Sequence, residues 1–443
     1  MSPSADPSSP AGRLQALRGT ILCAAILLTT LAWSFWWTAF AEVKTATLAA
    51  SVLALGLGAI AARQIPRGGG YAFLPLWLFL GYANVVAHLR PAYSLALTAE
   101  ENLRVLFILL TPLLGYDLLA NPAWQTRIKQ CIIAAGVLAA LLGILQYLGL
   151  VPFLFPVFPN YTQPVYSVFG NQDLFGGFLA ISLTLAALQF FNQHRISAPG
   201  IVVPLVLSIG LALSASRSAW LAAAAGILTA ILMARPPRRR LFYGALALVL
   251  LAAGLAFVAP EQTVGRVLET FSAGDDGGRL RLWFWDGTWR MFASSPWFGK
   301  GLGNFAFYSP RYLGAALLAP GGERHAWNEL HTDNAHCDPL ERLAETGVLG
   351  ALLVLWMLAR LLRCRREEWA PLVTLAVFCL FNAAFQSAPH ALAGVLLAGM
   401  LLSRRYEPGT PRGLGAALTA GAAAAASMAL FLFAVFIPSY YLR

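Results

Sequence analysis

The composition of this 443-residue chain excludes an ordinary soluble globular protein. The chain is 58% hydrophobic and only 12% charged, which is about half the charged fraction of a typical soluble domain. Many of its apolar runs approach the ~20 residues that a helix needs to cross a hydrocarbon core, and they are far too long for the strands of a membrane barrel. The sequence therefore predicts an all-α, polytopic membrane protein.

The apolar runs divide the chain into four parts. Residues 1–19 are predicted to be a disordered cytoplasmic tail, residues 20–259 the first nine spans, residues 260–345 one large outer loop, and residues 346–443 the remaining spans. We predict about 12–13 transmembrane helices. In chain order the expected spans are 20–40, 45–62, 71–87, 97–119, 130–150, 173–191, 200–215, 218–234, 241–259, 346–362, 369–386, 389–403 and 414–437.

The lysines and arginines predict the orientation of these spans. With the N-terminus in the cytoplasm, the inner segments hold eighteen of these residues and the short outer segments hold five. Because short cytoplasmic loops are enriched in Lys and Arg, this bias places the loop 260–345 outside. The net charge of +11 is then largely a topology signal. It does not indicate nucleic acid, because no interleaved basic and aromatic motif is present.

Two short outer segments carry polar motifs. The first is "GNQDLFGGFLA" at 170–180, in which Asn171 or Asp173 is suited to cap the following helix. The second is "SASRSAW" at 214–220, a turn that places Arg217 at the outer membrane surface. Arg217 has two interpretations: a snorkelling anchor, or a phosphate clamp, because a guanidinium group matches two phosphate oxygens at once.

The large outer loop contains a predicted helix at 279–293, which Pro296 follows before a Gly-rich turn. On this helix Leu282, Trp285 and Trp289 share one face. Such a face suits a helix lying at the membrane interface, and packing on top of the helix bundle is the alternative.

Two arginines, Arg279 and Arg281, stand at the start of the same helix. Residues two apart on a helix cannot both face one partner. One of them is therefore expected to be an ordinary solvated charge.

The most polar stretch of the chain is "NELHTDNAHCDPLERLAETGVLG" at 328–350. Within it Asp338, Pro339 and Glu341 predict a helix start, with Asp338 as N-cap, Pro339 at the first helical position and Glu341 at the third. His336 lies just outside the positive end of that helix. This position suits anion binding or proton transfer better than packing in a core.

A metal site is an alternative for this stretch. His331, Asp333 and His336 carry possible ligands, but their spacing matches no strict ligand pattern such as HExxH. We therefore predict no metal site.

Four motifs in this order resemble the O-antigen ligase/polymerase superfamily, which includes O-antigen ligases, some polysaccharide polymerases and bacterial O-linked protein glycosylases. They are "GNQDLFGGFLA", "SASRSAW", "RLWFW" followed by "SSPWFGKGLGNF", and "AHCDPLERLAETGVLG". The resemblance covers about residues 165–350 and the arrangement of spans. Arg217 matches the Arg of the family's serine turn, and His336 matches its functional His. Glu345 and Gly347 match the Glu and Gly that follow.

The resemblance also distinguishes the two loop arginines. The family places its Arg fifteen residues before a Pro and four before a Trp. Arg281 satisfies both conditions, with Pro296 and Trp285, whereas Arg279 satisfies only the second. Gln172 and Asp173 depart from the family's Pro-Asn, and Cys337 departs from an Asn.

The resemblance implies a glycosyltransferase at the periplasmic face of the bacterial inner membrane. The implied donor is a glycan on undecaprenyl pyrophosphate, and the acceptor is a hydroxyl, that of lipid A-core in an O-antigen ligase. Arg217 and Arg281 would hold the pyrophosphate, and His336 would be the base or orient the acceptor. Substrate-binding roles are also expected for a further group of residues: Arg279, His331, Glu345 and Asn171. Membrane lipids are expected partners, and neither nucleotide nor metal cofactor is needed.

Three other functions remain open at this point. A polysaccharide polymerase and an O-linked protein glycosylase differ from the ligase only in the acceptor. A transporter or flippase would need ionisable groups deep in facing spans, for which Glu100, Glu101 and Arg104 are the candidates. These three residues are equally interpretable as a paired structural cluster.

Overall fold

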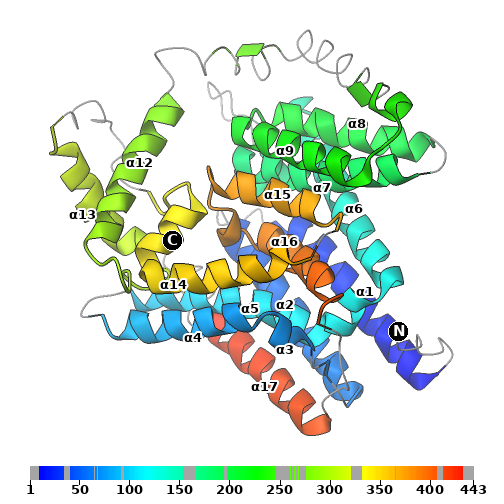
Figure 1. Ribbon diagram of the computed structural model, residues 1–443, viewed down its shortest axis with the longest axis horizontal. Helices are drawn as coiled ribbons and strands as arrows, with labels where there is room; N and C mark the ends of the chain where they lie inside the picture. The colour runs from blue at the N-terminus through cyan, green and yellow to red at the C-terminus, as the bar shows by residue number, and fades with distance from the viewer. Residues whose placement is uncertain are drawn as a thin grey trace.

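The computed structural model describes residues 9–33, 40–63, 65–66, 68–90, 94–152, 165–193, 197–242, 244–245, 260, 264–265, 268, 276–320, 332–364, 366–406 and 413–432. These residues form helices joined by turns, and none of them lies in a strand (Figure 1). The predicted all-α class is confirmed. Figure 1 shows most of the helices gathered in one bundle, with α12 and α13 beside it at one end.

Twelve helices correspond to predicted spans: α1 (Pro10–Leu31), α2 (Phe40–Ala61), α4 (Leu74–His88), α5 (Leu95–Ala120), α6 (Pro122–Tyr147), α7 (Gln172–Asn192), α8 (Ala198–Leu213), α9 (Arg217–Ala234), α14 (Asp338–Leu362), α15 (Trp369–Cys379), α16 (Ala388–Leu402) and α17 (Leu414–Phe431). By length and composition, eight helices in the described ranges can cross a membrane, and α4, α8, α15 and α16 are shorter apolar helices. The chain is thus a multi-pass membrane protein. The predicted span 241–259 lies almost entirely outside the described residues.

Shorter elements complete the described chain. They are α3 (Gly68–Ala72), η1 (Ser167–Phe169), α12 (Asp276–Ala293), α13 (Phe305–Leu317) and η4 (Ala384–Gln386). The helix predicted at 279–293 is α12, and it ends before Pro296 as expected.

Helix boundaries differ from prediction at three places. Helix α1 begins at Pro10, because the Ser9 side chain caps it by accepting a hydrogen bond from the Gly12 N–H; residues 10–19 of the predicted tail are therefore helical. The expected span 369–386 is interrupted, since α15 ends at Cys379 and η4 follows before α16. Helix α14 begins well before the expected residue 346 and includes the charged stretch.

The centre of the bundle is formed by α7 and α16. Every residue of α16 is buried, and α7 packs against α6, α8, α9 and α15. Close packing explains the two glycines of α7: a Cβ at Gly177 would lie 2.4 Å from the Phe378 ring, and one at Gly176 would lie 2.7 Å from the Ser214 Oγ. Leucines on outer helices, such as Leu57 and Leu232, are exposed as lipid-facing side chains are.

Helix α14 is broken at Gly347, and the break joins it to the Gly-rich turn after α12. Gly347 has φ 65° and ψ −171°, a conformation that is essentially restricted to glycine. Main-chain hydrogen bonds cross between the two segments: the Val348 N–H donates to the Pro296 carbonyl (2.8 Å), and the Gly301 N–H donates to the Glu345 carbonyl (2.7 Å). A Cβ at Gly347 would lie 2.4 Å from the main chain of Trp297.

Helix α12 packs on α13 through a face different from the aromatic face that the sequence predicts. Trp283 and Phe284 are buried there, and the Trp283 Nε1–H donates to the Leu313 carbonyl (3.2 Å). Leu282 and Trp289, on the predicted face, are 59% and 55% exposed. Trp285, the third residue of that face, is half-buried, and its ring lies 6.3 Å from that of Phe381 in the bundle. The face is therefore partly packed on the bundle and partly exposed, and both interpretations of α12 stay open.

Candidate active site

One pocket brings together the three residues that the sequence assigns to chemistry. Arg217, Arg281 and His336 line it, together with Asp173. These side chains come from the start of α9, from α12, from the segment before α14 and from the first turn of α7. We call this the arginine pocket.

Asp173 links the pieces of the arginine pocket. Its Oδ2 lies 3.2 Å from the Arg281 Nη2, and its Oδ1 accepts a hydrogen bond of 2.5 Å from the Ser216 hydroxyl. Ser216 is the N-cap of α9, the residue directly before Arg217. The carboxylate thus ties the loop helix to the serine turn. The sequence indicates Asp173 only as a helix cap, and the signal for a larger role is an acidic residue in the first turn of an apolar helix.

The serine turn is polar but satisfied inside the protein. Ser214, Ser216 and Ser218 are buried. The Ser214 hydroxyl donates to the Leu211 carbonyl (2.6 Å), and Ser218 accepts a hydrogen bond from the Asn382 side chain (2.8 Å). The serines therefore fix the shape of the turn that presents Arg217, since buried hydroxyl groups need such partners.

His336 is held in an uncommon conformation. Its φ is +50°, in the left-handed region that side chains other than glycine rarely adopt and that recurs at functional sites. The main-chain N–H of His336 donates to the Asn334 Oδ1 (3.1 Å), and the main-chain N–H of the preceding Ala335 donates to the Glu341 Oε2 (2.7 Å). The imidazole stacks on the Phe284 ring, with centroids 5.7 Å apart.

The surroundings of His336 favour the neutral imidazole. Burial lowers its pKa first, and the positive charge of Arg281 lowers it further, whereas Asp173 raises it. A neutral imidazole can accept a proton, so the ring is prepared to act as a base at neutral pH.

His336 also lines a second pocket, on whose wall Asn171 lies. Of the two predicted caps of this helix, Asn171 and Asp173, Asn171 is the N-cap of α7. Its Oδ1 accepts hydrogen bonds from the main-chain N–H groups of Asp173 (2.8 Å) and Leu174 (3.1 Å). We call this second space the amide pocket, after Asn171, Asn334, Asn382 and Gln386, which line it.

The remaining predicted site residues lie elsewhere. Arg279 is exposed and does not line the arginine pocket, whereas Arg281 does. Glu345 is buried behind the pockets and lines neither of them. His331 lies outside the described residues. The substrate-binding roles of these three residues stay predictions.

The predicted helix start is wrong by one residue. Cys337 is the N-cap of α14, and Asp338 is its first residue. The Asp338 carboxylate instead accepts from the Phe385 N–H of η4 (3.0 Å), because this buried position faces η4. Glu341 does reach back ahead of the helix, but to Ala335, and it also accepts from the Gln386 side chain (2.8 Å).

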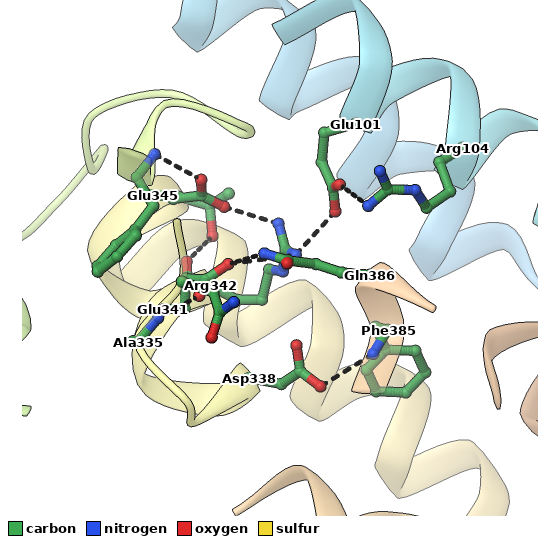
Figure 2. A network of polar contacts seen from close by, with 12 residues as sticks. Glu101, Arg104, Ala335, Asp338, Glu341, Arg342, Glu345, Phe385 and Gln386 are labelled. Atoms are coloured by element: carbon green, nitrogen blue, oxygen red, sulfur yellow. Dashed lines mark hydrogen bonds and ion pairs between the residues drawn. The ribbon is translucent and has the colours of Figure 1, made fainter. Parts of the chain in front are cut away.

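Next to the site lies a buried network of ionisable side chains, centred on Arg342 (Figure 2). The Arg342 guanidinium lies 2.7 Å from the carboxylates of both Glu101 and Glu345. Arg104 pairs with Glu100 and Glu101 at 2.6 Å. These contacts match the structural interpretation of the α5 charges. Glu345 also accepts from the Phe305 N–H (3.0 Å), so the network ties α5, α14 and the start of α13 together.

Within the described ranges, no group of three His, Cys, Asp or Glu side chains is close enough to hold a metal ion. His331, one of the three residues of the metal alternative, lies outside these ranges.

Comparison with known proteins gives one family. No curated protein matches the chain. Residues 202–355, which include Arg217, Arg281 and His336, match the family model described as O-antigen ligase. This match supports the membership of the chain in the O-antigen ligase/polymerase superfamily, and with it a glycosyltransferase-type activity of the ligase or polymerase kind.

Proposed function

We propose that the protein is an O-antigen ligase, which moves a glycan from undecaprenyl pyrophosphate to a hydroxyl of lipid A-core at the periplasmic face of the inner membrane. The observation that carries the proposal is the convergence of Arg217, Arg281 and His336 on one pocket. Two cations and a neutral imidazole at the outer end of apolar helices suit a substrate with a charged head at the membrane surface and a lipid tail within it.

The proposed step is a direct displacement at the anomeric carbon. The acceptor oxygen forms a bond to that carbon, and the bond from the carbon to the pyrophosphate oxygen breaks. His336 takes the hydroxyl proton, as a base whose ordinary pKa of about 6.5 is lowered by its surroundings. Arg217 and Arg281 stabilise the negative charge that develops on the leaving pyrophosphate.

The test of this proposal replaces His336 in the full chain. We expect His336→Ala to lower glycan transfer by about 10²–10⁴-fold, the usual contribution of a general base, with an unchanged protein level in the membrane. The measurement is the formation of lipopolysaccharide from lipid-linked O-antigen and lipid A-core in membranes. Transfer at the wild-type rate would remove His336 from the mechanism.

A deletion strain then separates the ligase from its relatives in the superfamily. Loss of a ligase leaves bare lipid A-core and accumulates lipid-linked polymer. Loss of a polymerase leaves single repeats on the core, and loss of a protein glycosylase leaves glycans unchanged but proteins unmodified. Either of the last two results would replace the ligase assignment.

A further inference from the structure

Two pockets with different chemistry adjoin the same imidazole. The arginine pocket contains two guanidinium groups and one carboxylate, whereas the amide pocket contains amides, a serine, Lys44 and the two aromatic rings of Phe40 and Phe169. His336 is the residue that both linings share. We propose that the amide pocket binds the sugar of the acceptor whose hydroxyl attacks the donor. This inference rests on the proposed function and specifies its acceptor class.

The amides of this pocket are oriented by the protein. Asn171 and Asn334 accept main-chain N–H groups through Oδ1, so their NH₂ groups occupy the other side of each amide. The NH₂ group of Asn382 donates to Ser218, and that of Gln386 donates to Glu341, which orients their carbonyl oxygens in turn. Among the described residues, none bonds to the NH₂ groups of Asn171 and Asn334 or to the carbonyl oxygens of Asn382 and Gln386.

The pocket therefore offers both donors and acceptors. A sugar hydroxyl needs both, because it donates one hydrogen bond and accepts others. A small number of fixed polar groups beside apolar rings is also the usual composition of a site for a neutral small ligand. A phosphate, by contrast, needs donors or cations only.

The one charged side chain on this wall is already engaged. Lys44 donates from Nζ to the Thr30 carbonyl (2.5 Å) and the Ala32 carbonyl (2.8 Å), and it lies 4.9 Å from the centre of the Phe169 ring. Its ammonium group thus binds carbonyl groups at the C-terminal end of α1. The amide pocket is consequently a poor site for the pyrophosphate and a suitable one for an uncharged part of a glycan.

The reaction geometry assigns the two pockets to the two substrates. In a direct displacement the attacking oxygen approaches the anomeric carbon from the face opposite to the leaving group. If the leaving pyrophosphate lies against Arg217 and Arg281, the attacking hydroxyl enters from another side, and the amide pocket is the second space that His336 lines. A sugar hydroxyl in this place favours a ligase or polymerase over a protein glycosylase.

The experiment uses the double variant Asn171→Asp, Asn334→Asp in the purified full-length protein. Asp keeps the Oδ1 acceptor and is an equally good helix cap, but it removes both NH₂ donors. With undecaprenyl-pyrophosphate-linked glycan and lipid A-core as substrates, we expect the acceptor KM to rise about tenfold or more while the donor KM stays unchanged. Asn192→Asp, at the exposed far end of α7, is the matched control and should change neither constant.

A calorimetric titration without donor separates this inference from the proposed function. Its probes are lipid-free core oligosaccharide and, in parallel, the free repeat unit of the donor glycan. If the wild type transfers nothing to lipid A-core, the ligase assignment fails, yet binding of either sugar that weakens in the double variant still supports the amide pocket. Three results would overturn the inference: no sugar binding by the wild type, equal affinity in both proteins, or a rise of the donor KM alone.

Discussion

Two polar regions meet at the start of α14, and their charged side chains differ in burial and in partners. In the network next to the site, Arg342 lies 2.7 Å from both Glu101 and Glu345, whose side chains are 8% and 1% exposed. In the arginine pocket, Arg281 touches Asp173 at 3.2 Å, and both side chains are about a fifth exposed. The network charges are satisfied by other parts of the protein and hold helices together. The pocket charges border a space that a ligand can enter.

The difference shows that a polar residue in a membrane protein is interpreted best through its partners. Glu345 and His336 belong to one motif and lie nine positions apart, yet one joins the network and the other lines both pockets. Substitutions in the network should therefore change stability, and substitutions in the pocket should change activity.

The largest expected effect on stability comes from Arg342→Ala. This change leaves the carboxylates of Glu101 and Glu345 buried without their shared cation, a loss of about 3–5 kcal/mol for a buried ion pair. The measurement is the unfolding midpoint of detergent-solubilised protein, with Arg342→Lys as an intermediate case. The matched control is Arg290→Ala, which breaks the exposed Arg290–Asp286 pair and should cost about 0.5 kcal/mol or less. Equal midpoints for Arg342→Ala and the wild type would show that the network does not hold the fold.

The next effect is on activity at constant stability. Arg281→Ala should lower transfer by about 10²–10³-fold, as expected for the loss of one group that stabilises a developing anion. Arg279→Ala, two residues away on the exposed side of α12, should leave transfer close to the wild-type rate. Transfer rates and unfolding midpoints are measured on the same preparations. A reversed order of the two variants would contradict the assignment of Arg281.

The smallest effect is a displacement of the pH profile. Because the base must be neutral and the pKa of His336 is lowered, kcat/KM should stay constant from neutral pH down to below pH 6.5 and fall only at more acid pH. Arg281 contributes to the lowering, so Arg281→Gln should move the acid limb to higher pH, whatever its maximal rate. If the fall of kcat/KM at acid pH stays at the same pH in Arg281→Gln, this fall does not reflect the protonation of His336.

The sequence predicted the residues of the arginine pocket better than their surroundings. Arg217, Arg281 and His336 stand in motifs, and a motif records which residue types are needed in which order. Asp173 was missed because its partner Arg281 is 108 positions away, and no local pattern reports such a pair.

The amide pocket was missed for a different reason. Asn382 and Gln386 fall inside the apolar run predicted as one span, 369–386, and hydropathy does not reveal the end of α15 at Cys379. The break at Gly347 was overlooked in the same way, because glycine is common in membrane helices and only the docked turn explains its conformation here.

The join at Gly347 has a consequence for how freely this region can vary in sequence. The turn and α14 are held together by main-chain atoms of residues 296–301 and 344–349, and exchange of a side chain does not delete a main-chain donor or acceptor. The aromatic residues of the turn, Trp297 and Phe298, are 63% and 50% exposed. Sequence drift is therefore tolerated at exposed positions such as these two. It is barred at Gly299 and Gly347, where a side chain would meet the opposite main chain, and at Gly301, where it would meet the main chain of Ala87. The alignment of Arg281 with His336 thus depends on the absence of side chains at these three glycines.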